Sequence, residues 1–234
     1  MSVATAGEIA LRTVEIPPIG LPGDLALPQS ARGVVVFAHG SGSSRFSSRN
    51  RFVAQVLQHA GLGTLLMDLL TSAEEEADRS SGHLRFDIRL LAGRLVDATN
   101  WLRSNLETAS LRIGYFGAST GGGAALVAAA EQPRDIAAVV SRGGRPDLAG
   151  AKLSLVQAPT LLIVGGRDEP VMEWNEIALG QLRCEKKLEI VPSATHLFEE
   201  PGTLEQVARL ASGWFHRYLA FAPQNPGRPE RTQN

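Results

Sequence analysis

The fold is decided by the stretch Leu111-Arg-Ile-Gly-Tyr-Phe-Gly-Ala-Ser-Thr-Gly-Gly-Gly-Ala-Ala-Leu-Val-Ala-Ala-Ala-Glu131. Residues 111–116 form a mostly apolar run typical of a buried strand, and the alanine-rich residues 122–131 predict a helix. Between them, Gly117-Ala-Ser-Thr-Gly121 matches G-x-S-x-G, the nucleophile elbow, in which a sharp strand-to-helix turn exposes a serine. We therefore expect the Ser119 hydroxyl to lie at the carboxyl end of a strand, beside the positive end of a helix.

This motif is weak when it stands alone, because glycine and serine are common residues. The alternative is a glycine-rich turn in which Ser119 only caps the following helix. The strand predicted before the motif and the helix predicted after it favour the nucleophile.

Strand-like and helix-like segments alternate on both sides of this motif. Further apolar runs cover residues 33–38, 63–67, 136–140, 160–164 and 187–191, and helical patterns cover residues 51–60, 88–102 and 204–219. Strands that are apolar throughout are typical of a parallel sheet buried on both faces. The pattern predicts an α/β fold with a mostly parallel, doubly wound sheet flanked by helices. Residues 9–16 and the Pro/Gly-rich turn after them predict one or two antiparallel edge strands.

Length and composition limit the remaining possibilities. The 234 residues suit a single domain over residues 1–221, and the Pro-rich residues 222–234 predict a disordered tail. A net charge of −1 gives no basic field for nucleic acid or an anionic membrane. The single cysteine, Cys184, excludes an internal disulfide and a cysteine-based zinc cluster. Without a signal-peptide pattern or a long apolar span, we expect a cytoplasmic protein; its oligomeric state stays open.

A general base is expected after the serine, at the carboxyl end of another strand, where sites of open α/β sheets lie. Only His196 and His216 follow Ser119. His216 belongs to an amphipathic helical pattern, which favours a structural role. His196 follows the predicted strand 187–191 and is the candidate base; the alternative is a surface loop histidine.

The candidate acid is Asp168, which follows the predicted strand 160–164. Its carboxylate would accept the histidine Nδ1–H and stabilise the imidazolium. The alternative is a turn or cap residue before Pro170. Glu169 and, more distantly, Asp147 are the other carboxylates near this edge of the sheet.

Oxyanion stabilisation is assigned to the backbone N–H groups of Ser41 and Thr120. Thr120 follows the serine, and Ser41 lies in the small-residue loop after the strand 33–38, which supplies the second donor in such folds. The sequence has neither G-x-G-x-x-G nor a P-loop, so no nucleotide cofactor is expected, and no metal site is predicted. We expect His39, which precedes this loop, to be structural.

Two further segments follow strands at the same edge. Arg142 and Arg145 are candidates to bind a substrate carboxylate, with a structural salt bridge as the alternative. Residues 69–84 lack clear periodicity and are interpreted as a flap over the site or a solvated loop. The short connection between Arg142 and Thr160 leaves no room for a cap domain, which predicts an open, shallow pocket for small substrates.

Four segments resemble the α/β-hydrolase superfamily, specifically its dienelactone hydrolase-like group. They are Val36-Phe-Ala-His-Gly-Ser-Gly42, Gly117-Ala-Ser-Thr-Gly-Gly122, Leu162-Ile-Val-Gly-Gly-Arg-Asp168 and Ala194-Thr-His-Leu-Phe-Glu-Glu-Pro201. The resemblance implies Ser119 as nucleophile, Asp168 as acid and His196 as base, with no cofactor. The namesake enzymes use cysteine at the elbow, so Ser119 favours a serine carboxylesterase acting on a small ester.

Two other functions remain open. One is a non-catalytic binding protein on a hydrolase fold, and the other is an acyltransferase that uses the same three residues. The resemblance includes relatives described as fused to a phosphoribosyltransferase domain, and we do not expect such a domain within these 234 residues.

Overall fold

The computed structural model describes residues 9–220, so the predicted tail over residues 222–234 lies outside the described residues. The strands are β1 (Leu11–Ile16), β2 (Leu21–Ala26), β3 (Gly33–Ala38), β4 (Gly63–Met67), β5 (Arg112–Ala118), β6 (Ile136–Arg142), β7 (Thr160–Gly165) and β8 (Lys186–Val191). The helices are α1 (Ser48–His59), α2 (Ser72–Ser81), η1 (Leu84–Phe86), α3 (Ile88–Ser104), α4 (Thr120–Glu131), η2 (Pro146–Leu155), α5 (Glu169–Gln181) and α6 (Thr203–Leu219).

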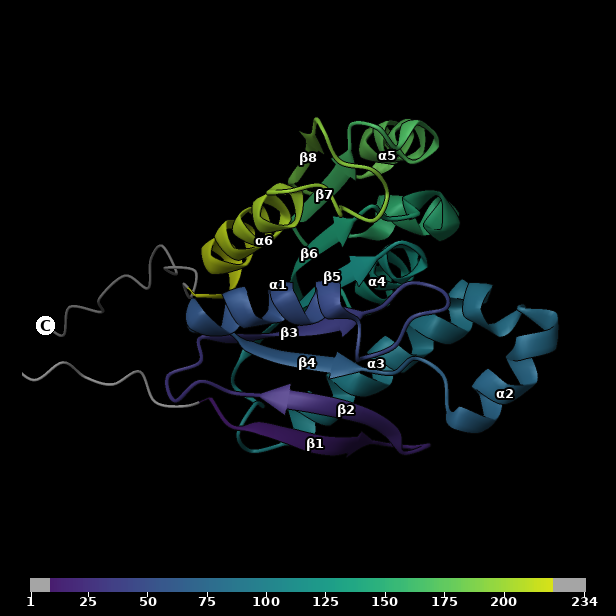
Figure 1. The fold of residues 1–234 in the computed structure, drawn as a ribbon. Helices are drawn as coiled ribbons and strands as arrows, with labels where there is room; N and C mark the ends of the chain where they lie inside the picture. Colours follow the sequence, from purple (N-terminus) through teal and green to yellow (C-terminus); the bar gives the residue numbers. More distant parts are fainter. Residues whose placement is uncertain (1–8, 221–234) are drawn as a thin grey trace, which may run out of the picture.

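All the strands belong to one sheet with the order β1-β2-β4-β3-β5-β6-β7-β8 (Figure 1). β1 pairs antiparallel with β2, and β2 pairs antiparallel with β4. The remaining neighbours are parallel. The predicted doubly wound, mostly parallel sheet is confirmed. The prediction of antiparallel strands near the start of the chain is also confirmed: β1 and β2 are antiparallel, and only β1 lies at an edge of the sheet.

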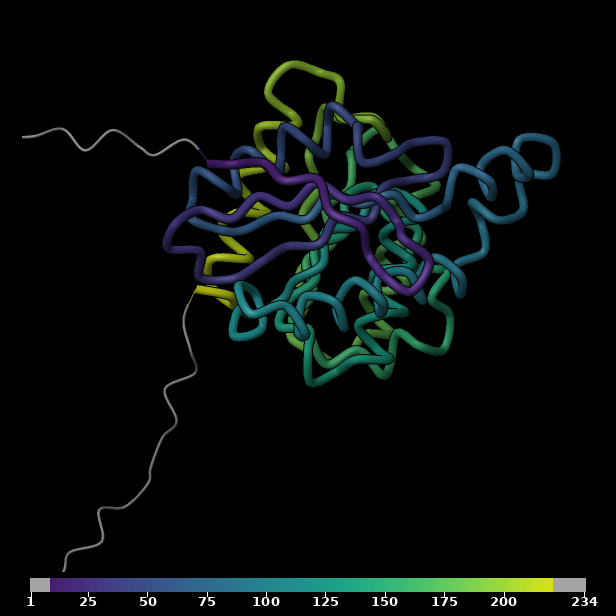
Figure 2. The backbone as a smooth tube through the Cα atoms, turned by 90° about the horizontal axis from the view of Figure 1, so that it is seen from below, coloured from purple at the N-terminus to yellow at the C-terminus, as the bar shows by residue number. Residues whose placement is uncertain are grey.

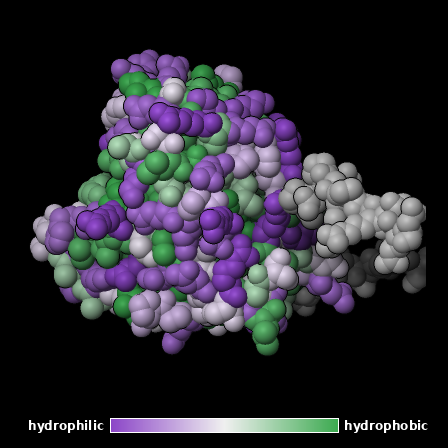
Figure 3. Space-filling model, turned by 180° about the vertical axis from the view of Figure 1, so that it is seen from behind, coloured by the Kyte–Doolittle hydropathy of each residue, from purple (hydrophilic) through white to green (hydrophobic). Residues whose placement is uncertain are grey.

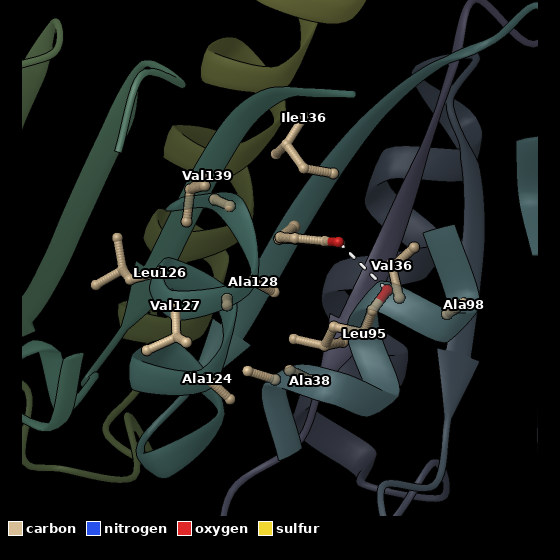
Figure 4. Close-up of a cluster of buried hydrophobic side chains, with 14 of the residues drawn as sticks. Val36, Ala38, Leu95, Ala98, Ala124, Leu126, Val127, Ala128, Ile136 and Val139 are labelled. Atoms are coloured by element: carbon tan, nitrogen blue, oxygen red, sulfur yellow. Dashed lines mark hydrogen bonds between the residues drawn. The ribbon is translucent and has the colours of Figure 1, made fainter. Parts of the chain in front are cut away.

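The central strands are apolar throughout because helices cover both faces of the sheet. Along β3, Val34, Val36 and Ala38 face the core under α3 and α4, whereas Val35 and Phe37 face the core under α1 and α6. Figure 4 shows Val36 and Ala38 close to Leu95 of α3 and to the alanine-rich helix α4. Each large side chain buried here contributes about 1.5–3 kcal/mol to stability. These two cores hold the carboxyl ends of the strands in place.

Most of residues 69–84 is helical, so the interpretation of this segment as a solvated loop is wrong, whereas its interpretation as a flap over the site stays a prediction. Thr71 caps α2 through a reciprocal capping box: its hydroxyl accepts the Glu74 N–H, and the Glu74 carboxylate accepts the Thr71 N–H. The helix ends at Gly82 in the left-handed conformation, and η1 follows. α2 projects beyond the carboxyl ends of β3 and β4 in Figures 1 and 2. Helix α2 therefore borders this edge of the sheet, and we call it the α2 wall.

Two other connections at this edge differ in how well they were predicted. The expected short helix between Arg142 and Thr160 is η2, which leaves that connection without a cap domain. Helix α5, by contrast, was not predicted from its sequence.

In the part of the chain from residue 9 to residue 220, no helix has the length and apolarity needed to cross a membrane.

Candidate active site

The turn between β5 and α4 holds Ser119 in a strained backbone conformation, with φ 52° and ψ −122°. The Ser119 N–H donates to the Arg142 carbonyl at 3.2 Å, and the Ser119 carbonyl accepts the N–H groups of Gly122 and Arg145. Side chains at Gly117 or Gly121 would collide with the backbone that packs against this turn. The G-x-S-x-G spacing is therefore required by packing, and it projects the hydroxyl from the sheet edge.

His196 lies in the loop after β8, which is separated from β5 by β6 and β7, and this loop brings the imidazole back to the serine. Its Nε2 is 3.3 Å from Ser119 Oγ, and its Nδ1 is 2.7 Å from Asp168 Oδ2. A carboxylate only accepts, so this contact assigns the proton to Nδ1 and leaves the Nε2 lone pair facing the hydroxyl. The three residues singled out in the sequence thus form one hydrogen-bonded chain, Asp168–His196–Ser119.

The other candidates for acid and base lie elsewhere. Asp147 forms a two-pronged ion pair with Arg145, at 2.7 and 2.9 Å. Glu169 is the first residue of α5, and His216 is in the last turn of α6. Asp168 precedes α5 without capping it through its side chain, so the cap alternative for this residue is wrong.

His39 is a buried structural residue, as expected. Its Nδ1 lies 2.9 Å from the Gly40 carbonyl, and its Nε2 accepts the Leu69 N–H at 3.2 Å. The carbonyl can only accept, so the proton belongs on Nδ1 and the ring is neutral. Burial lowers the pKa of His39, against the opposing effects of the Gly40 hydrogen bond and the carboxylates of Asp68 and Glu75. The imidazole ties the loop after β3 to the chain after β4.

The two predicted oxyanion donors lie next to each other, with one feature that the sequence did not indicate. Thr120 is the first residue of α4, where a helix leaves its N–H without an intrahelical acceptor. The Ser41 N–H donates to the Thr120 hydroxyl at 2.9 Å. The Ser41 N–H is therefore already hydrogen-bonded to the side chain of Thr120, the residue whose backbone N–H is the other predicted donor. A bound oxyanion would have to share or replace that hydrogen bond.

Two cavities meet at Gly40 and Ser41. The larger cavity, of about 480 Å³, extends from Thr120 to α2 and η1. The smaller cavity, of about 250 Å³, is lined by Ser119, His196, Leu197, Arg142, Arg49 and Asn50. The serine hydroxyl and the imidazole thus border the smaller cavity, and the α2 wall borders the larger one.

The two candidate arginines have different surroundings. Arg145 is clamped by Asp147 and its guanidinium lies 4.0 Å from the centre of the Trp174 ring. Arg145 lines neither cavity, so its position agrees with the alternative role in a structural salt bridge and not with substrate binding. Arg142 lines the smaller cavity beside Ser119 and is only 6% exposed.

Among known protein families, one matches most of this chain. The sequence model of the dienelactone hydrolase family matches residues 21–222, which include the whole site. The chain belongs to the dienelactone hydrolase family. A solved dienelactone hydrolase from Anabaena variabilis is 61% identical over 92% of this chain and all of its own, with a TM-score of 0.88. Family and fold together support a hydrolase.

More distant structures share the fold alone. Est1E from Butyrivibrio proteoclasticus is 16% identical with a TM-score of 0.72, over 88% of this chain and 98% of its own. A dienelactone hydrolase-like promiscuous phosphotriesterase from metagenomic libraries is 17% identical with a TM-score of 0.71, over 91% of this chain and all of its own.

Two curated relatives from Mycobacterium tuberculosis strains carry another name. Both are called "Putative phosphoribosyl transferase" and are 57% identical over 222 residues, which are 93% of this chain and 49% of theirs. The chain therefore spans about half the length of the curated relatives it matches.

Proposed function

We propose that the protein is a serine hydrolase that cleaves small carboxylic esters through an acyl-enzyme intermediate. The observation that carries this proposal is the hydrogen-bonded chain Asp168–His196–Ser119. His196 Nε2 takes the hydroxyl proton as Ser119 Oγ attacks the ester carbonyl, and Asp168 stabilises the resulting imidazolium. His196 then protonates the leaving alkoxide. In the second half-reaction it takes a proton from water, whose attack releases the carboxylic acid and the free serine.

Two backbone donors would stabilise the oxyanion of each tetrahedral intermediate. The Thr120 N–H is at the positive end of α4, and the Ser41 N–H lies across the same opening. Loss of one such donor typically costs 10²–10³-fold in rate. The hydrogen bond from Ser41 to the Thr120 hydroxyl keeps the loop after β3 next to the elbow, and the Ser41 N–H would turn from that hydroxyl to the oxyanion, or be shared with it, when substrate binds.

A short-chain chromogenic ester such as 4-nitrophenyl butyrate tests the proposal. Wild-type protein should hydrolyse it, and Ser119→Ala should reduce kcat by about 10³-fold or more. Ser154→Ala, which removes an exposed hydroxyl from η2, is the matched control and should keep the wild-type rate. Equal rates for wild type and Ser119→Ala would refute the nucleophile.

The two alternative functions give different results. A binding protein on a hydrolase fold would form no covalent adduct at Ser119 with a fluorophosphonate probe. An acyltransferase would label, but in the presence of competing nucleophiles it would pass the acyl group to them in preference to water. We assign ester chemistry to this chain because the match to the dienelactone hydrolase family covers residues 21–222, whereas the relatives named for a phosphoribosyl transferase match this chain over only 49% of their own length.

A further inference from the structure

The smaller cavity contains a buried cation without a counter-charge. Arg142 ends β6, is 6% exposed, and has an Nε with no hydrogen-bond partner. Within residues 9–220 it forms no ion pair; its described contact is the Phe198 ring, 5.7 Å from the guanidinium. Burial, followed by repulsion from Arg49, lowers the pKa of Arg142 to about 10. At neutral pH it therefore remains charged.

Two other partly buried arginines have acidic partners. Arg45 pairs with Asp68, and Arg94 pairs with Glu74. Buried charges in proteins are normally paired in this way, because desolvation of an isolated charge is costly. Arg142 is more deeply buried than either, and it faces a cavity instead of a carboxylate.

The polar neighbours of Arg142 in this cavity also suit an anion. Arg49 of α1 brings a second guanidinium, which itself pairs with the exposed Glu199. Asn50 is 3% exposed, and its side-chain Oδ1 has no partner. The Asn50 amide NH₂ group carries two N–H donors at this wall of the cavity.

The position of the imidazole identifies which part of an ester would enter the smaller cavity. His196 Nε2 must protonate the leaving oxygen, so the alcohol departs on the side where the imidazole lies. His196 and Leu197 border the smaller cavity, whereas the larger one is bordered by Thr120 and α2. The acyl group then belongs in the larger cavity.

We propose that the natural substrate is an ester of a small alcohol that carries an anionic group, and that Arg142, with Arg49 and Asn50 beside it, binds this group in the smaller cavity. This inference rests on the proposed ester hydrolysis. The chemistry is unchanged: the bond between the carbonyl carbon and the alcohol oxygen breaks, water supplies the hydroxyl of the acid, and His196 returns a proton to the alcohol. Arg142 acts on binding and orientation only.

A matched pair of esters tests the proposal with the full chain. The butyrate ester of glycolate is anionic, and the butyrate ester of glycolamide is neutral and of nearly the same shape; pH-stat titration measures kcat/KM for both. After division by each ester's hydroxide-catalysed rate, wild type should prefer the anionic ester at least 10-fold, the size expected for one charge-assisted pair. The butyrate ester of 2-hydroxyethyl phosphate shows whether a phosphate is preferred to a carboxylate.

Two substitutions locate the effect. Arg142→Gln should remove the preference by lowering kcat/KM for the anionic ester about 10- to 100-fold, with the neutral ester within about 3-fold. Arg134→Gln removes an exposed cation before β6, at the opposite end of that strand, and should leave the preference unchanged. If Arg142→Gln does not fold, Arg49→Gln replaces it and should reduce the preference about 3-fold.

The outcomes separate this inference from the proposed function. Hydrolysis of both esters that depends on Ser119 but shows less than 2-fold preference would overturn the anionic substrate and leave the esterase intact. Equal losses on both esters in Arg142→Gln would also overturn it. If neither ester is hydrolysed in a Ser119-dependent way, the proposed function fails and this inference fails with it.

Discussion

Asp168 occupies the position before α5, yet its carboxylate contacts an imidazole and not the helix backbone. Replacement by Asn keeps the shape but presents an amide, which favours the wrong tautomer of His196. We expect Asp168→Asn to lower kcat about 10³- to 10⁴-fold, as loss of the acid does in serine proteases. Because no cap is lost, the melting temperature should stay within a few degrees of wild type, which differential scanning fluorimetry measures.

Glu169→Gln is the matched control for this substitution. Glu169 is the exposed neighbouring carboxylate, and its loss should leave the turnover of 4-nitrophenyl butyrate within about 2-fold. A larger loss in Glu169→Gln than in Asp168→Asn would show that the wrong carboxylate has been assigned.

His39 makes stability depend on pH below neutrality. Its pKa in the folded chain lies below the usual 6.5, so the unfolded chain binds the proton more readily. Above pH 6.5 both states are neutral and the residue adds no pH dependence. As the pH falls below 6.5, stability is lost until the folded pKa is reached. The free energy of unfolding should therefore decrease between pH 7 and pH 5, and less steeply in His39→Gln; parallel curves in urea titrations would contradict this.

The residues of the site differ in how far the sequence could predict them. Ser119, Asp168 and His196 each follow a strand, and the carboxyl ends of parallel strands meet at one edge, so their proximity could be inferred. The hydrogen bond from Ser41 to the Thr120 hydroxyl and the clamp of Arg145 by Asp147 depend on side-chain rotamers. No spacing rule contains that information.

At the scale of elements, the tight packing of the β5–α4 turn has a measurable cost. A Cβ at Gly121 would lie 2.6 Å from the His39 carbonyl oxygen, where only backbone can give way. Gly121→Ala should therefore reduce the free energy of unfolding by about 3 kcal/mol or more. Chemical denaturation monitored by circular dichroism measures this change.

Gly93→Ala is the opposite case among the glycines. Gly93 lies within α3 and has open space where a Cβ would stand, so alanine should raise the free energy of unfolding by about 0.5–1 kcal/mol. If Gly121→Ala raised the free energy of unfolding as Gly93→Ala should, the close approach of the backbone at Gly121 would not be a steric constraint.

Helix α2 shows why one element was missed. Its sequence Ser-Ala-Glu-Glu-Glu-Ala-Asp-Arg-Ser-Ser has no apolar stripe, and Asp78 is its only buried residue. The helix is held by its capping box and by the ion pair between Glu74 and Arg94 of α3. The Thr71-x-x-Glu74 spacing was the signal that could have predicted its start. Hydrophobic periodicity alone misses helices that project from the core.

At the scale of the molecule, the sheet and its two cores explain where the substrate can bind. Helices cover both faces, and Figure 3 shows hydrophilic and hydrophobic side chains interspersed over the face opposite to that of Figure 1. The two cavities described at the site lie at the carboxyl edge of the strands, under the α2 wall and beside His196. A substrate bound at Ser119 would reach both cavities. Substitutions in one cavity should therefore change the preference for the acyl group, and substitutions in the other should change the preference for the alcohol, independently of each other.

The continuous sheet also predicts that the chain unfolds in one step. Strands β3, β5 and β6 contribute side chains to both cores, so neither core can open without breaking the same strands. Trp101, Trp174 and Trp214 lie on α3, α5 and α6, and their fluorescence reports on both faces of the sheet. Fluorescence and far-ultraviolet circular dichroism should give superimposable guanidinium transitions. Different guanidinium midpoints for the two signals would show two folding units. A single cooperative midpoint would show that this chain folds as one unit without the additional length of its curated relatives.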